Sequence, residues 1–229
     1  MMRKLGILGG MSWESSAVYY RLLNEGVRAR AGGLSSARLV MSSVDFGELS
    51  AAMTAGRWDD VSAVLEREAR GLEAAGAEAI LIASNTIHKV APAVKASTKV
   101  PLLHIADGLA RAIKAKGCVS PLLLATRFTM EELFYREDLL QRHGITVRVP
   151  DQAGRDALHR IIFEELCLGV ARPASKARAL EIVNASGGDG VILGCTELML
   201  MLSDADFSVP VFDTTVLHVA DALDFLLPT

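Results

Sequence analysis

Short runs of apolar residues alternate along the chain with longer stretches in which apolar residues recur at helical spacing. Runs of this length, bounded by glycine, asparagine or proline, are typical of strands that are buried in a parallel sheet. Eight principal strands are predicted, at residues 5–8, 37–44, 79–83, 100–105, 119–125, 146–149, 190–193 and 209–212. The alternation of strand and helix predicts an α/β protein with a doubly wound, parallel architecture.

The second half of the chain repeats the pattern of the first at an offset of about 110 residues. Residues 77–86 resemble residues 188–197, and residues 99–107 resemble residues 208–216. Such a repeat predicts two similar halves related by a pseudo-dyad, with a ligand in the cleft at the carboxyl ends of their strands. We expect the first half to contain residues 1–98 and 209–229 and the second half to contain residues 99–208, joined by simple crossovers.

Composition and charge narrow the class of partner. The 229 residues are 51% apolar and carry a formal net charge of −3, which supplies a large core but no positive field for nucleic acid or an anionic membrane. The apolar runs are far shorter than the roughly 20 residues of a membrane span, and the N-terminal run is too short for a signal peptide. We therefore expect a soluble, cytoplasmic protein with a small-molecule partner.

The three cysteines are widely spaced, odd in number and free of any CxxC pattern. The five histidines lack partners at the spacing of metal ligands. Neither a disulfide framework nor a metal site is therefore expected.

Two short polar clusters follow equivalent strands of the repeat: Ser84-Asn85-Thr86 in the first half and Cys195-Thr196-Glu197 in the second. Two groups that approach one ligand from opposite sides suit the inversion of a stereocentre, because one removes the α-proton and the other returns a proton to the opposite face. A free cysteine is commonly a small buried apolar residue. Cys195, however, follows Gly194 at the point where a strand passes into the start of a helix, and this position favours a chemical role.

Two further turns are candidate binding loops. The Gly9-Gly10-Met11-Ser12 turn can bind an anion through its amides, or can need glycine for backbone reasons alone. It does not match the G-x-G-x-x-G fingerprint, so a nicotinamide cofactor is not indicated. Thr126 and Thr129, at the matching turn of the second half, can bind a carboxylate or cap the following helix.

Six motifs along the chain share a pattern with a known family. They are GGMS at residues 9–12, SVDF at 43–46, NTIH at 85–88, TRFT at 126–129, IFEEL at 162–166 and GCTE at 194–197. Together they resemble the aspartate/glutamate racemase family over nearly the whole chain, and the pairing of NTxH with GCTE at this spacing is more specific than either motif alone.

The resemblance implies a cofactor-independent amino-acid racemase with two flavodoxin-like halves, commonly a homodimer, and two facing acid/base residues that are usually both cysteines. Cys195 corresponds to the second of these, and Ser84 stands where the family has the first. The same alignment assigns substrate binding to Met11, Asn85, Thr86, Thr126, Glu165, Thr196, Glu197 and Met53.

The departures from the family pattern sharpen the functional hypothesis. A serine hydroxyl is a much weaker base than a thiol, so we expect an L-selective racemase of aspartate and glutamate with Ser84 facing Cys195. The family's basic substrate-binding positions align near Met53 and Cys167, which are not basic, and Arg57 is a nearby substitute. The alternatives are another cysteine-dependent enzyme of the superfamily (a maleate isomerase, a hydantoin racemase or an arylmalonate decarboxylase) and a binding protein that retains amino-acid affinity without catalysis.

Overall fold

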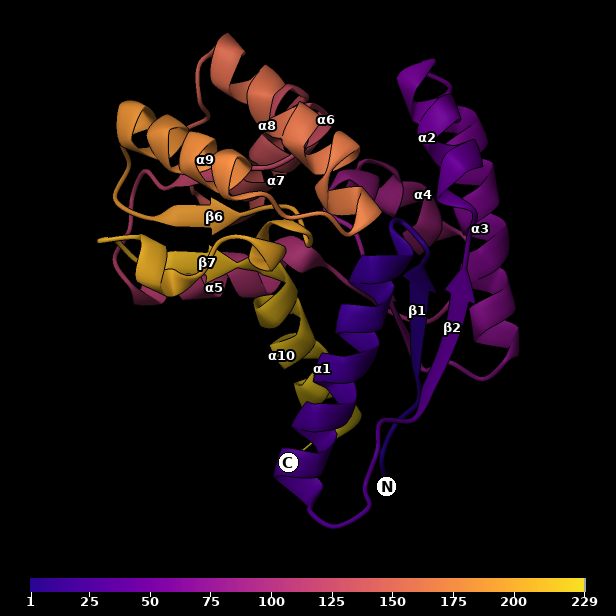
Figure 1. Ribbon diagram of the computed structural model, residues 1–229. Helices are drawn as coiled ribbons and strands as arrows, with labels where there is room; N and C mark the ends of the chain where they lie inside the picture. Colours follow the sequence, from indigo (N-terminus) through magenta and orange to yellow (C-terminus); the bar gives the residue numbers. More distant parts are fainter. Residues whose placement is uncertain (229) are drawn as a thin grey trace. The chain divides into compact units, whose positions relative to one another are not determined.

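The computed structural model describes residues 1–228, and the chain divides into two compact units. The first unit contains Met1–Ile105 and the end of the chain from His218, and the second contains Ala106–Leu217. Each unit has its own parallel sheet with helices on both faces (Figure 1), so the predicted α/β fold with parallel sheets is confirmed.

The first sheet has the strand order β2-β1-β3-β4. All three pairings are parallel. Its strands are β1 (Leu5–Gly9), β2 (Leu39–Ser43), β3 (Ala79–Ile82) and β4 (Leu102–Leu103). The helical elements of the first unit are α1 (Trp13–Ala31), α2 (Phe46–Thr54), α3 (Trp58–Ala74), the 3₁₀ helix η1 (Thr86–Val90) and α4 (Ala91–Ala96), and the last part of α10 (Thr214–Leu226) also belongs to it.

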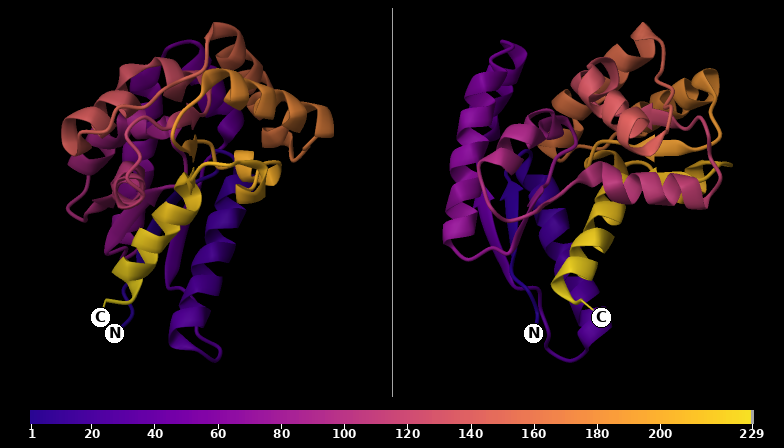
Figure 2. Two further views of the ribbon diagram at one scale, coloured as in Figure 1. Left: turned by 90° about the vertical axis from the view of Figure 1, so that its left-hand side faces the viewer. Right: turned by 180° about the vertical axis from the view of Figure 1, so that it is seen from behind.

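One face of the first sheet packs against α1 and α10. Alternate residues of β1 and β3 point to this face, as the two-residue period of a strand requires, and they form one buried cluster with apolar side chains of both helices. The cluster consists of Leu5, Ile7, Tyr19, Leu23, Val27, Ala79, Leu81, Ala83, Val219, Ala222, Leu223 and Leu226. Gly26 of α1 lets Leu223 of α10 approach closely. The first residues of the chain lie beside the end of α10 (Figure 2), where Arg3 N donates to Leu226 O at 3.0 Å.

The second sheet has the strand order β5-β6-β7, again parallel. Figure 1 shows α5 on one side of it and α8 and α9 on the other. Its strands are β5 (Leu122–Leu124), β6 (Val191–Leu193) and β7 (Val211–Asp213). The helical elements of this unit are α5 (Ile105–Ala115), α6 (Arg127–Glu131), α7 (Leu133–His143), α8 (Gln152–Glu164), η2 (Leu166–Leu168), α9 (Pro173–Ser186), η3 (Leu198–Leu200), η4 (Asp204–Asp206) and the start of α10.

The sixth predicted strand, residues 146–149, is wrong as a strand. It is reduced to an isolated parallel bridge between Arg148 and Leu122, with two backbone hydrogen bonds of 2.9 Å. Pro150 follows and has no N–H to extend the ladder, which explains the early end. The bridge still lies beside β5, as β2 lies beside β1, so the strands of both units follow the same order.

The predicted boundaries of the two halves also differ from the observed units. Residues 99–105 were expected in the second half, but β4 pairs with β3 in the first sheet. Residues 209–217 were expected in the first half, but β7 pairs with β6 in the second sheet. The chain therefore leaves each unit only after β4 or β7, because each of these strands is hydrogen-bonded to the preceding strand of its own sheet.

The turn after β1 depends on Gly10, whose φ is +89°. A Cβ added there would lie 2.3 Å from Val44 O and 2.5 Å from Val44 N. The Gly10 amide donates to Ser16 Oγ at 2.7 Å, so it is not available to bind an anion. The positive φ and the close approach of the Val44 backbone therefore explain why residue 10 is glycine.

We predict that Gly10→Ala lowers the free energy of unfolding by at least about 3 kcal/mol, since backbone strain adds to a clash that the Val44 backbone cannot relieve. Gly56→Ala is the matched control, because Gly56 has a φ of +71° but open space around its Cβ position. That variant should cost about 1 kcal/mol. Urea unfolding measures both, and equal losses would contradict the proposed clash.

Candidate active site

The turn after β3 carries the first polar cluster. Ala83 N donates to Leu8 O at 2.9 Å, which extends the pairing of β3 with β1 by one hydrogen bond beyond the strand. Ser84 follows immediately, and Asn85 and Thr86 lead into η1. All three side chains are more than nine-tenths buried. The sequence motif therefore becomes a compact polar turn at the carboxyl edge of the first sheet.

The turn after β6 carries the second cluster in the same way. Gly194 N donates to Leu124 O at 2.8 Å, the counterpart of the bond between Ala83 and Leu8. A Cβ on Gly194 would lie 2.5 Å from a methyl carbon of Leu123, so glycine lets this turn approach β5 closely. Cys195 is the second residue after β6, as Ser84 is the second residue after β3.

A hydrogen-bonded carboxylate lies beside the Cys195 thiol. The thiol donates to Glu197 Oε2 at 3.0 Å, and Thr196 Oγ1 donates to the same oxygen at 2.7 Å. Burial raises the pKa of Cys195 well above its usual range, and the negative charge of Glu197 raises it further. Cys167 makes a smaller contribution in the same direction. At neutral pH the resting site therefore holds a protonated thiol with an acceptor for its proton.

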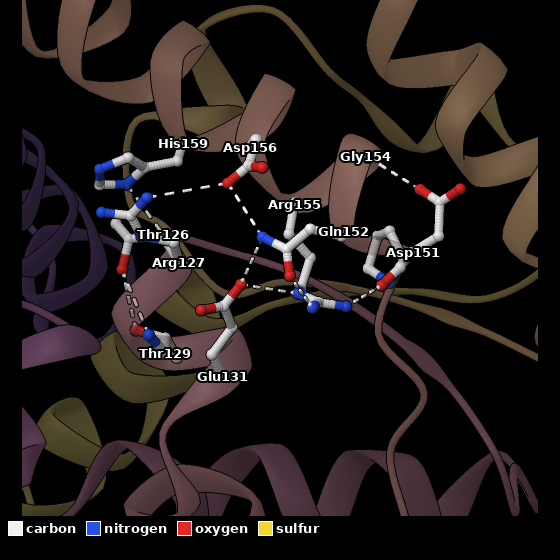
Figure 3. Close-up of polar contacts among 11 residues, drawn as sticks. Thr126, Arg127, Thr129, Glu131, Asp151, Gln152, Gly154, Arg155, Asp156 and His159 are labelled. Carbon is white, nitrogen blue, oxygen red and sulfur yellow. Dashed lines mark hydrogen bonds and ion pairs between the residues drawn. The ribbon is translucent and has the colours of Figure 1, made fainter.

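Thr126 lies at the turn after β5, next to the turn that carries Cys195. It is the N-cap of α6, where its Oγ1 accepts from Thr129 N at 3.4 Å and lies 3.2 Å from Thr129 Oγ1. Figure 3 shows the two threonines facing one another at the start of this helix. Of the two roles predicted for Thr126, helix capping is therefore present in the structure.

A network of polar side chains fastens α6 to α8 (Figure 3). Arg155 Nε lies 2.9 Å from Glu131 Oε1, and Arg155 Nη1 donates to Pro150 O at 2.7 Å. At the other end of α6, Arg127 N donates to His159 Nδ1 at 3.4 Å. Burial lowers the pKa of His159, with the Arg127 charge as the next cause. The neutral ring can therefore keep accepting the Arg127 amide hydrogen and help to fix the helix that Thr126 caps.

The remaining predicted residues take different positions. Met11 is buried in the turn after β1, the strand next to β3, and Met53 is buried on α2. Glu165 follows α8 and interacts with the start of α9, where its Oε2 accepts from Ser175 at 2.6 Å and its Oε1 lies 3.1 Å from Arg172 Nη1. The Glu165 carboxylate thus accepts a hydrogen bond from Ser175 and forms an ion pair with Arg172, and the sequence indicated neither interaction.

Arg57, the substitute cation, lines a cavity of about 460 Å³ next to the end of β2. It pairs with Asp60 at 2.5 Å, and both side chains are more than half exposed. Asp45, Glu48 and Glu68 line the same cavity. The acidic neighbours reduce the attraction that Arg57 offers to a substrate carboxylate.

Residues 1–228 contain no group of three or more histidine, cysteine, aspartate or glutamate side chains that could hold a metal ion. Within the same residues, no helix has the length and apolar character that a membrane span requires.

Comparison with known proteins matches this geometry to a class of isomerases, the racemases. A family model described as Asp/Glu/Hydantoin racemase matches residues 8–222. A candidate Asp/Glu racemase from Yersinia pestis is 46% identical, with 98% of this chain and 99% of that chain covered and a TM-score of 0.90. An aspartate racemase homologue from Pyrococcus horikoshii is 35% identical, with the same coverage and a TM-score of 0.83. The aspartate racemase of Picrophilus torridus, 22% identical over 97% of this chain and 93% of its own, shares the fold with a TM-score of 0.76.

The chain belongs to the Asp/Glu/Hydantoin racemase family. The resemblance inferred from the motifs is thereby confirmed, and the family is one of isomerases.

The contact between thiol and carboxylate predicts how Cys195 reacts. Iodoacetamide modifies the thiolate, so the alkylation rate of Cys195, measured by peptide mass spectrometry, should rise only at alkaline pH. Glu197→Gln removes the negative charge that raises this pKa, so the midpoint of the pH profile should move to lower pH.

Thr196→Val is the matched control, because it removes a hydrogen bond to Glu197 without changing the charge. Its midpoint should stay close to that of the unmodified protein. An unchanged or more alkaline midpoint in Glu197→Gln would show that the carboxylate does not govern the thiol.

Proposed function

We propose that this protein is a cofactor-independent racemase of aspartate and glutamate that exchanges the α-proton of the L-enantiomer preferentially. The observation that carries the proposal is the equivalence of Ser84 and Cys195, each the second residue beyond corresponding parallel strands. Family membership and the aspartate racemase homologue at 35% identity support the choice of acidic amino acids. The same resemblance supports a homodimer in the cytoplasm.

Cys195 and Glu197 supply the acid/base pair for one face of the substrate. The thiol first passes its proton to the Glu197 carboxylate, which leaves a thiolate and a neutral carboxylic acid without changing the net charge of the buried site. The thiolate then takes the α-proton of the L-amino acid and becomes a thiol again, and the electron pair of the broken C–H bond stays on the substrate. Reversal of this step restores the L-enantiomer.

Ser84 serves the opposite face as a proton donor. Its hydroxyl transfers a proton to the carbanion to give the D-enantiomer, and the resulting alkoxide recovers a proton from water. The hydroxide left by that water takes the proton held by Glu197, which returns both the thiol and the carboxylate to their resting forms. Among the described residues, its hydroxyl has no hydrogen-bond partner and therefore no adjacent base such as activates catalytic serines elsewhere. Ser84 is for this reason a far better donor than base, and removal of the α-proton from the D-enantiomer is the slow step.

Substrate binding is assigned to the polar residues that flank the two acid/base groups. Asn85 and Thr86 belong to the turn of Ser84, and Thr196 belongs to the turn of Cys195. Met11 and Thr126 lie on the turns after the neighbouring strands β1 and β5. Glu165 and Met53 complete the proposed set as supporting residues, since Glu165 is already engaged by Ser175 and Arg172.

The proposal predicts the effects of three substitutions on the conversion of L-aspartate to D-aspartate, measured by chiral chromatography. Cys195→Ala should abolish conversion, because no other group replaces the thiolate base. Ser84→Cys should raise conversion by roughly tenfold, because a thiol transfers protons in both directions more readily than a hydroxyl. Cys118→Ser, at a thiol that donates to Asp189 O, is the control and should leave conversion unchanged. Full activity in Cys195→Ala would refute the assignment.

A panel of substrates separates this function from its alternatives. Hydantoins, maleate and arylmalonates test the other cysteine-dependent reactions, because none of them offers an α-amino acid carboxylate. We expect turnover of aspartate or glutamate and no turnover of hydantoins, maleate or arylmalonates. Stabilisation by aspartate against heat, without turnover or exchange of its α-proton, would instead indicate a binding protein.

A further inference from the structure

His88 is a buried residue of η1 whose two ring nitrogens both form hydrogen bonds. Its Nδ1 lies 2.7 Å from Ser84 O, and its Nε2 lies 3.2 Å from Ile105 N, at the first residue of α5. The side chain is 3% exposed. A single imidazole thus connects the residue assigned to one face of the substrate with the junction between β4 and α5.

The chemistry of the two partners fixes the tautomer. A carbonyl oxygen can only accept, so Nδ1 carries the hydrogen and donates to Ser84 O. A backbone amide can only donate, so Nε2 has no hydrogen and accepts from Ile105 N. A proton added to Nε2 would meet the Ile105 N–H and break that bond. Both hydrogen bonds therefore require a neutral His88.

The surroundings keep His88 neutral. Burial lowers its pKa well below the usual range, and nearby His104 and His218 add to this effect. The His104 ring meets His88 edge to face at 4.5 Å between centroids, and the His218 ring lies at 6.0 Å. His218 is itself fixed, since its Nε2 donates to Leu103 O at 2.9 Å and its Nδ1 accepts from Tyr19 Oη at 3.0 Å. The imidazole is thus rigidly packed.

Ser84 depends on this contact for its orientation. Its hydroxyl has no hydrogen-bond partner among the described residues, so its position follows from the backbone. That backbone is held on one side by the bond between Ala83 N and Leu8 O and on the other by the bond from His88 to Ser84 O. Displacement of a reacting group by about 1 Å can reduce a rate about 100-fold, so the second bond is important.

We propose that His88 is a positioning residue that holds the Ser84 carbonyl and thereby aims the Ser84 hydroxyl at the substrate. This inference rests on the proposed function, because it gives Ser84 one half of the proton transfer. It assigns His88 no contact with the substrate. Loss of the hydrogen bond should therefore slow the return of a proton by Ser84 and leave the removal of a proton by Cys195 unchanged.

Two variants separate the two nitrogens of the ring. An asparagine amide nitrogen occupies nearly the position of Nδ1, so His88→Asn should still donate to Ser84 O. A glutamine amide reaches the position of Nε2, so His88→Gln should retain the bond to Ile105 N and lose the bond to Ser84. The matched pair changes the same side chain and differs in the bond that the proposal invokes.

The test follows L-aspartate in D₂O by proton NMR, which measures loss of the α-proton, together with chiral chromatography, which measures D-aspartate. We expect His88→Gln to lower inversion by about 10-fold to 100-fold while loss of the α-proton stays within about threefold of the unmodified protein. His88→Asn should retain inversion within about threefold. Equal losses of exchange and inversion in both variants, or no loss in either, would overturn the proposal.

A spectroscopic measurement keeps the inference testable if the variants fold poorly. In the unmodified protein labelled with ¹⁵N-histidine, the two nitrogen shifts of His88 should report the neutral Nδ1–H tautomer, also at pH values where exposed histidines are charged. The opposite tautomer or a charged ring would refute it. Absence of any α-proton exchange in the unmodified protein would instead refute the proposed function, so the two failures are distinguishable.

Discussion

In each unit, one backbone hydrogen bond beyond the end of a parallel strand pair sets the position of a candidate catalytic group. The bond from Ala83 N to Leu8 O extends the pairing of β3 with β1 by one residue, and Ser84 follows. The bond from Gly194 N to Leu124 O does the same for β6 and β5, and Cys195 follows. Parallel strands present their carboxyl ends at one edge of a sheet, so these turns lie where α/β proteins bind ligands. The repeat of strand order in the two units gives the same position to two different side chains.

Burial then determines what each side chain can do. Cys195 lies beside Glu197, and the thiol stays protonated at neutral pH although its proton has an acceptor at 3.0 Å. Among residues 1–228 the Ser84 hydroxyl has no hydrogen-bond partner, and its position is set by its backbone. The proposed acid/base pair is therefore asymmetric. Racemisation has an equilibrium constant of one, so kcat/KM must be equal in both directions, and the asymmetry is expected in proton exchange without inversion.

The sequence was sufficient for the parallel α/β fold because the apolar runs and their spacing record the period of the elements directly. It was also sufficient for the two polar turns and the family, since Ser84, Cys195 and their neighbours follow apolar runs at a constant offset. It was not sufficient for residues 146–149, where Pro150 limits pairing to one bridge, or for the sheet to which β4 and β7 belong. Those outcomes depend on pairing between distant segments. The partners of Glu165 and the hydrogen bond from Ile105 N to His88 likewise arise only when α9 and the β4–α5 junction come into place.

The central claim is that one thiol and one hydroxyl divide the two faces of the substrate unequally. The most direct measurement compares L-aspartate and D-aspartate as starting compounds in D₂O and follows α-deuteration and configuration together. We predict that recovered L-aspartate gains deuterium faster than D-aspartate forms, whereas recovered D-aspartate keeps its proton while deuterated L-aspartate accumulates. Equal ratios of exchange to inversion from the two enantiomers would contradict the account.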